Sequence, residues 1–221
     1  PNARGIELRL ATLARLRAAG VPTQAAVAPL LPCDPERLAR LLCDPARPAV
    51  LIFAGKAHPH DVPAQHLIKQ IHDYSLRPEF QGHIILLEGY DLALARKLVT
   101  GVDVWLNNPE YPLEASGTSG QKAGMNGVIN LSVLDGWWAE GYNGKNGWAI
   151  TPHGPGYDPN YRYREEGQEL LDTLEKQVIP LYYSRNGHGY SDGWVRMSKE
   201  SMKSLIPRFN AERMVMDYVR K

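Results

Sequence analysis

Cysteine is scarce in this 221-residue sequence: only Cys33 and Cys43 occur, and neither lies in a CxxC motif or a Cys/His cluster. We therefore expect no zinc site, and we expect reduced thiols in a cytoplasmic protein. A strong excess of charge is also missing, since 25 Lys and Arg face 24 Asp and Glu. This balance predicts no general attraction to nucleic acid or to anionic membranes. Nor is there an apolar run near the ~20 residues that cross a bilayer, or a secretory signal pattern.

What the sequence does contain is an alternation of apolar runs and amphipathic segments. The apolar runs predict strands at residues 49–54, 83–87, 102–106 and 128–133, and the segments between them predict helices at 62–75, 91–99 and 120–126. This order predicts a doubly wound α/β fold with a parallel sheet. Ligands on such sheets bind at the carboxyl ends of the strands, here residues 55–56, 88–90, 107–108 and 134–135.

The two ends of the chain read differently. Residues 6–19 predict a helix, residues 21–32 predict a linker or irregular coil, and Asp34-Pro35-Glu36 is typical of a helix start. We therefore divide the chain into an N-terminal segment, 1–33, and a main domain, 34–221. Beyond an expected loop at 151–164, helices are predicted at 165–176, 195–206 and 211–219. Because the chain begins with Pro1 and not Met, we expect the natural protein to be longer.

The segment from Glu114 to Gly127, EASGTSGQKAGMNG, is the most informative part of the chain. Its small residues place glycine backbone, hydroxyls and free amides at the end of a strand and the start of a helix, which suits a phosphate group. Lys122 follows among Ala, Gly and Met neighbours, which would desolvate it and favour Schiff-base chemistry. A phosphate cradle beside a buried lysine is what pyridoxal 5′-phosphate (PLP) requires. The alternative is an exposed glycine-rich loop followed by an ordinary surface lysine.

The same residues resemble the PLP-lysine signature of α-glucan (glycogen, starch and maltodextrin) phosphorylases, in which the lysine lies eight residues after the glutamate. The turn at residues 54–59, AGKAHP, and Glu88-Gly89-Tyr90 resemble further elements of that family. Residues 126–150, with their DGWWAE sequence, resemble its short subfamily. The resemblance extends over about residues 34–220 and implies the Rossmann-like C-terminal half of a GT-B glycosyltransferase fold, followed by C-terminal helices.

The resemblance also implies roles for individual residues. Lys122 would hold PLP as a Schiff base, and Gly117 and Thr118 would bind the cofactor phosphate. Tyr90 would lie near the pyridine ring. The hydroxyls of the transferred glucose would bind to Glu114 and to the three residues after it, Ala115, Ser116 and Gly117. The implied reaction is phosphorolysis of α-1,4-glucan by inorganic phosphate, which yields glucose 1-phosphate and in which the cofactor phosphate exchanges a proton with inorganic phosphate.

One departure from the family pattern concerns cations. Family members carry a basic segment before the stretch that matches Asp34, whereas residues 21–33 here contain no Lys or Arg. The family also has a preceding domain, which this chain is too short to contain, so a separate N-terminal domain or a homo-oligomer partner is expected. We therefore expect PLP binding by this chain alone, but not phosphorolysis.

Other residues with possible chemistry have simpler interpretations. Trp137 and Trp138 could stack on a sugar, but core packing is the favoured interpretation. His58 and His60 have no third metal ligand near them in the sequence, so no metal site is expected. Lys56 could contact an anion or only cap a strand end. Glu140 is expected to be structural.

Three functions remain open from the sequence. The first is a PLP-dependent glucan phosphorylase. The second is a PLP-free transferase resembling glycogen synthase, which shares the two-domain architecture but needs no lysine at position 122. The third is a non-catalytic sugar-binding or PLP-binding remnant, which the missing basic segment favours.

Overall fold

The computed structural model describes residues 23–26 and 34–220, and these residues contain one parallel sheet of six strands. The strands are β1 (Thr23–Ala26), β2 (Val50–Ala54), β3 (Ile84–Leu87), β4 (Val104–Asn107), β5 (Ile129–Val133) and β6 (Gly147–Ile150). Their order is β3-β2-β1-β4-β5-β6, and each neighbouring pair is parallel. The strands β2 and β3 are therefore added on one side of β1, and β4, β5 and β6 on the other side. Such a reversal creates a ligand-binding crevice at the carboxyl ends of the strands.

The strand β1 corrects one expectation from the sequence. Residues 21–32 were predicted to be linker or coil, yet Thr23–Ala26 form a central strand paired with both β2 and β4. The sequence TQAA has weak strand propensity, so its conformation comes from pairing on both sides and not from local preference. The predicted helix at 6–19 lies outside the described residues, and the proposed division of the chain at residue 34 stays a prediction.

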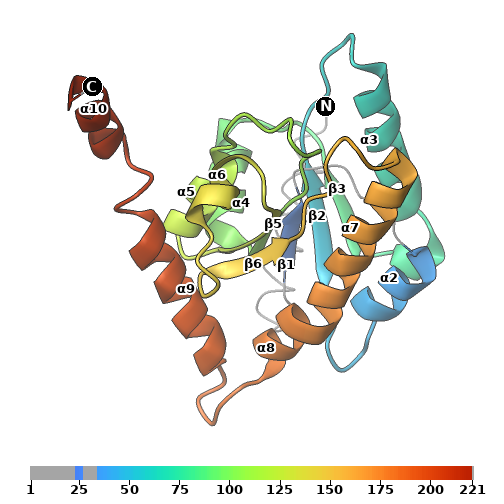
Figure 1. Ribbon diagram of the computed structural model, residues 1–221. Coiled ribbons are helices and arrows are strands. Elements are labelled where there is room, and N and C mark those ends of the chain that lie inside the picture. The colour runs from blue at the N-terminus through green and yellow to red at the C-terminus, as the bar shows by residue number, and fades with distance from the viewer. Residues whose placement is uncertain (1–22, 27–33, 221) are drawn as a thin grey trace.

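Helices cover both faces of the sheet, which confirms the doubly wound α/β class (Figure 1). On one face, α2 (Pro35–Leu42), α3 (Val62–Ser75) and α7 (Pro159–Thr173) pack against alternate strand residues such as Leu51 and Phe53. On the other face, α4 (Leu92–Gly101) and α5 (Ser119–Met125) pack against the intervening strand residues, such as Val50 and Ile52, which alternate with Leu51 and Phe53 along β2. Because side chains alternate along a strand, continuous apolar runs are needed to bury both faces.

The predicted central strands and helices are all present, with ends shifted by at most two residues. Besides β1, the elements that were not predicted include the edge strand β6 and the short helices α6 (Gly136–Gly141) and α8 (Ile179–Tyr183). The helix α7 also begins inside the expected loop at 151–164, because the Asp158 side chain caps it by accepting hydrogen bonds from the backbone N–H groups of Asn160 and Tyr161.

The C-terminal part of the chain continues as a series of helices. After α7 come a π-helical segment, η2 (Leu174–Val178), and the helices α8 (Ile179–Tyr183), α9 (Asp192–Leu205) and α10 (Ala211–Arg220); a short 3-10 turn, η1 (Pro78–Phe80), precedes β3. Figure 1 shows α10 standing apart from the sheet, and none of its residues is buried. Over the described ranges, no helix combines the length and the apolar character that a membrane span requires.

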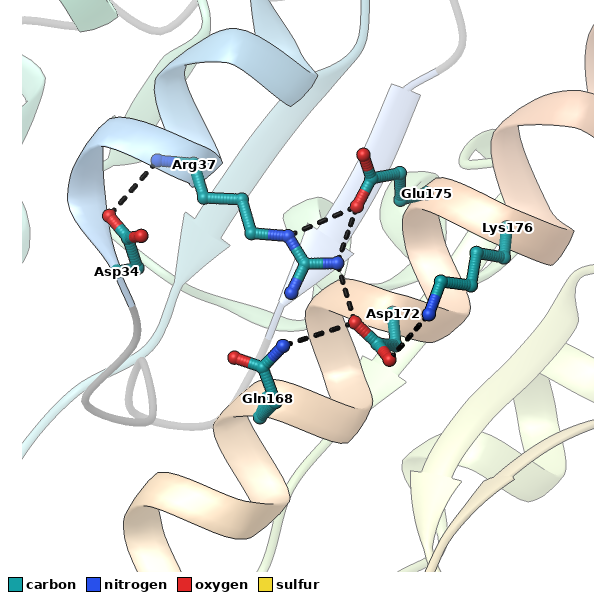
Figure 2. Close-up of polar contacts among 6 residues, drawn as sticks. All are labelled: Asp34, Arg37, Gln168, Asp172, Glu175 and Lys176. Carbon is teal, nitrogen blue, oxygen red and sulfur yellow. Dashed lines mark hydrogen bonds and ion pairs between the residues drawn. The ribbon is translucent and has the colours of Figure 1, made fainter.

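A polar network fastens α2 to the end of α7 (Figure 2). Arg37 on α2 donates hydrogen bonds to Asp172, at 2.5 Å, and to Glu175. Lys176 donates to the other oxygen of Asp172, at 2.8 Å. The hydrogen bond from Lys176 and then that from Arg37 lower the pKa of Asp172. The network thus joins α2 to α7 through Arg37 and Asp172, which are 135 residues apart in sequence, and both helices cover the same sheet face.

Candidate functional site

The glycine-rich loop and Lys122 follow β4, one of the two strands at which the halves of the sheet meet. The strand β4, next to β1, ends at Asn107, and the chain then runs through a loop to α5. The neighbouring strand β5 ends at Val133, and Asp135 follows immediately before α6. The loop from Glu114 to Thr118 therefore lies at the carboxyl edge of the sheet, as expected for a ligand-binding segment.

Glu114 is the half-buried carboxylate of this loop. The Asn107 side-chain amide donates to both of its oxygens, at 3.3 Å to Oε1 and 3.1 Å to Oε2. The backbone N–H of Glu114 donates to Asp135 Oδ2 at 3.1 Å. Burial raises the pKa of Glu114, the hydrogen bond from Asn107 opposes this rise, and the negative charge of Asp135 adds to it. Glu114 therefore keeps its proton to a higher pH than an exposed glutamate.

The loop after Glu114 folds back so tightly that glycine is required at two positions. Gly117 has a φ of +75°, and an added Cβ would lie 2.2 Å from Glu114 Oε1. Gly136 has a φ of +50°, and an added Cβ would lie 2.6 Å from the carbonyl oxygen of Ser116. The same carbonyl accepts a hydrogen bond from the backbone N–H of Trp137 at 2.8 Å. The start of α6 thus holds the Glu114 loop against the sheet.

Lys122 lies one helical turn after Thr118 on α5. Its Nζ donates to Thr118 Oγ1 at 3.3 Å, and both side chains are exposed. The expected desolvation of Lys122 by its neighbours is therefore wrong. Ala123 and Gly124 are buried, but successive residues of a helix point about 100° apart, so these neighbours do not cover the lysine. Its amine is accessible to a ligand.

The other predicted residues are arranged around this centre. Tyr90, just after β3, is half-buried and packs against a cluster that includes Leu94 and Ala123, the residue after Lys122. Ala115 and Ser116 are exposed. The structure thus places Thr118 next to Lys122 and Gly117 next to Glu114. Tyr90 and the residue after Lys122, Ala123, belong to the same hydrophobic cluster.

The two adjacent tryptophans belong to the core, as favoured from the sequence. Trp137 is 3% exposed and Trp138 is fully buried. The indole N–H of Trp138 donates to the carbonyl oxygen of Trp148 at 3.0 Å, and both rings pack against Leu205 of α9. No face of either ring is free to stack on a sugar ring.

The remaining polar candidates are exposed and dispersed. His58 and His60 have ring centroids 5.4 Å apart, and Lys56 and Glu140 lie on the surface. In the part of the chain that the structure describes, no three His, Cys, Asp or Glu side chains gather in a group that could hold a metal ion.

Asn107 and Asp135 are site residues to which the sequence analysis gave no role. Both had been placed at carboxyl ends of predicted strands, and a polar residue directly after a buried strand is the signal that could have marked them. Their contact with Glu114 could not be predicted, because Asp135 is 21 residues away in sequence.

Known proteins similar to this chain are named phosphorylases. A family model described as "Carbohydrate phosphorylase" matches residues 37–141. The glycogen phosphorylase of Aquifex aeolicus is 50% identical over 188 residues, which are 85% of this chain and 27% of that protein. The maltodextrin phosphorylase of Thermococcus litoralis is 49% identical over 194 residues, 88% of this chain and 23% of that protein. The chain thus spans about a quarter of the length of these relatives. Residues 37–141 thus match the carbohydrate phosphorylase family, and the similarity to named phosphorylases extends over 85–88% of the chain.

Proposed function

We propose that this chain is the PLP-binding and glucose-binding part of an α-glucan phosphorylase. Together with the remaining length seen in its relatives, it would take part in phosphorolysis of α-1,4-glucan by inorganic phosphate, which yields glucose 1-phosphate. The observation that carries this proposal is the contact between Lys122 and the loop that begins at Glu114, beyond the carboxyl end of β4. The chain in which it occurs is 50% identical, over 188 residues, to a protein named glycogen phosphorylase. The same proposal places the enzyme in the cytoplasm, where the free thiol of Cys43 would stay reduced.

The residues present fit PLP. The cofactor needs an amine that it can reach, and the exposed Lys122 supplies one, without the burial that the sequence analysis had expected. It needs hydroxyl and amide donors for its phosphate; the turn at Gly117 and Thr118 would supply them, and Thr118 Oγ1 lies 3.3 Å from that amine. Tyr90 would lie beside the ring. When bound, the cofactor would supply its phosphate as an acid–base partner for inorganic phosphate.

The glucose-binding role falls to the loop that begins at Glu114. A half-buried carboxylate held by Asn107 still has lone pairs to accept hydrogen bonds from sugar hydroxyls. Ala115 and Ser116 are exposed beside it, and their backbone groups would bind further hydroxyls. Because the loop is fixed by Gly117 and Gly136, these groups would be oriented before the sugar arrives.

Two alternatives make different demands on the same residues. A PLP-free transferase resembling glycogen synthase has no use for a lysine at position 122. A non-catalytic remnant is favoured by the lack of Lys and Arg in residues 21–33, because two phosphates at contact distance need cations to stabilise them.

The test of cofactor binding is a labelling experiment. The purified chain is incubated with PLP, reduced with borohydride and digested, and mass spectrometry locates the modified lysine. We expect the label on Lys122 and its loss in Lys122→Ala. The matched control is Lys97→Ala, which removes an exposed helical lysine of α4 and should leave the label on Lys122 unchanged. Labelling spread evenly over surface lysines would contradict the proposal.

A second assay separates the enzyme from the remnant. The chain is combined with the N-terminal part of a close relative, and release of glucose 1-phosphate from maltodextrin and phosphate is measured. Release that depends on Lys122 supports the phosphorylase. Specific labelling of Lys122 without any release would favour the remnant.

A further inference from the structure

We propose that Asn107 and Asp135 are positioning residues, which hold Glu114 and the loop after it in the geometry that binds glucose. This inference rests on the proposed function, since it assigns the groups that prepare the sugar-binding carboxylate of that site. Neither residue would touch the substrate in this role. Each would act through Glu114.

Asp135 connects two segments that are distant in sequence. Asp135 is 6% exposed, and its two carboxylate oxygens accept from different backbone N–H groups: Oδ2 from Glu114 at 3.1 Å and Oδ1 from Gly136 at 2.8 Å. Hydrogen bonds to an ionised acceptor are roughly twice as strong as neutral ones. One buried carboxylate therefore fixes the start of the sugar-binding loop to the start of α6.

The adjacent residues of α6 complete this attachment. The backbone N–H of Trp137 donates to the carbonyl oxygen of Ser116 at 2.8 Å, so the loop is held at both Glu114 and Ser116. The Trp137 side chain is buried against Phe209, with ring centroids 5.3 Å apart, which anchors α6 in the core. The loop therefore cannot shift without moving a packed helix.

Asn107 acts on the side chain of Glu114 and not on its backbone. Its amide reaches both carboxylate oxygens, at 3.3 and 3.1 Å, and lies 3.5 Å from Ser132 Oγ on β5. Asn107 is the last residue of β4, so the donor sits on a rigid strand in the sheet. A residue of the strand β4 therefore orients the Glu114 carboxylate, and a residue at the start of α6 holds the Glu114 backbone.

The two contacts make opposite predictions for the titration of Glu114. Three effects act on the pKa of Glu114. Burial raises it, the hydrogen bond from Asn107 lowers it, and the negative charge of Asp135 raises it. Asn107→Ser should therefore raise the pKa of Glu114, and Asp135→Asn should lower it. A residue that only stabilised the fold would not produce shifts of opposite sign.

The experiment is an NMR titration of the full chain with ¹³C-labelled glutamate, with Glu114 assigned by its loss in Glu114→Gln. The matched control is Asp34→Asn, because Asp34 also accepts from two backbone N–H groups, at the start of α2. We expect a higher Glu114 pKa in Asn107→Ser, a lower one in Asp135→Asn and an unchanged one in Asp34→Asn.

Shifts of the same sign in the two site variants, or no shift in either, would overturn the proposal. If Asp135→Asn does not fold, two other measurements replace it: the Glu114 pKa in Asn107→Ser, which should rise, and the exchange rate of the Glu114 amide in Asp135→Glu, which should increase. An unchanged pKa together with an unchanged exchange rate would then overturn the proposal. The titration needs neither PLP nor glucan. Opposite shifts without labelling of Lys122 would therefore leave the positioning of Glu114 standing while the proposed function fails.

Discussion

Replacing Gly120 with alanine tests how α5 is seated, because this glycine is buried where the helix approaches the sheet. An added Cβ would lie 2.6 Å from Asn130 Oδ1 and 2.7 Å from Trp137 Cζ2, whereas ordinary contacts begin near 3.4 Å. Neither neighbour can move easily. Asn130 is fully buried and donates to the carbonyl oxygen of Gly120 at 3.0 Å, and the Trp137 ring is 3% exposed within the core.

The expected magnitude follows from two opposing effects. Overpacking in a filled core costs about 1–3 kcal/mol. The change from glycine to alanine within a helix returns about 1 kcal/mol. Because both contacts lie below 3.0 Å, which real Cβ atoms essentially never show, the cost falls in the upper part of that range, about 2–3 kcal/mol, and we expect Gly120→Ala to lower the free energy of unfolding by roughly 1–2 kcal/mol. It should also weaken PLP labelling of Lys122, which lies half a turn further along α5.

Urea unfolding followed by tryptophan fluorescence measures the effect, as a lower midpoint with an unchanged slope. The matched control is Gly187→Ala, since an added Cβ there meets nothing within 4 Å and the backbone does not have a positive φ. This control should be neutral or slightly stabilising. A Gly120→Ala protein as stable as the wild type would refute the reasoning, because it would mean that α5 does not approach Asn130 and Trp137 this closely.

Two further predictions concern the opposite side of the sheet. Arg37→Met should lower the free energy of unfolding by up to about 1 kcal/mol, and the loss should shrink in high salt, because the ion pairs of Figure 2 are partly exposed. Equal losses in low and high salt would contradict an electrostatic role. Tyr183 donates its hydroxyl to the carbonyl oxygen of Pro48 at 2.7 Å, and burial raises its pKa from 10.0 to about 12. The neutral phenol therefore stabilises the fold fully below pH 10, and this contribution is lost as the pH rises towards 12. Tyr183→Phe should lower the free energy of unfolding by about 1 kcal/mol at neutral pH. In urea unfolding, the difference in this free energy between Tyr183→Phe and the wild type should narrow above pH 10. A difference that stays constant with pH would argue against the hydrogen bond.

The central elements of the fold could be predicted because their local signals agree with their tertiary environment. The run AVLIFA became β2, since a strand buried on both faces is apolar at every position. The helix predicted at 62–75 has these same bounds in the structure, where Asp61 caps it and Pro63 lies in its first turn.

The strands β1 and β6 were missed because their sequences carry little strand preference. The residues TQAA of β1 adopt a strand by pairing with two neighbours. In β6, Gly147 begins the strand, and an added Cβ would lie 2.4 Å from the carbonyl oxygen of Asn130 on β5. Glycine there permits close pairing, whereas in the sequence it resembles a turn.

The candidate site divides in the same way. The sequence by itself determined that a glycine-rich turn, a glutamate and a lysine follow one strand, because these residues lie within nine positions of one another. Only the tertiary structure decided that Lys122 is exposed, because helix geometry turns its buried neighbours away from it. Only the sheet order brought Asp135 to the backbone of Glu114, since parallel pairing of β4 and β5 aligns their carboxyl ends. The chemistry of the groups is local in the sequence, whereas their burial, charge and orientation come from neighbours that folding brings together.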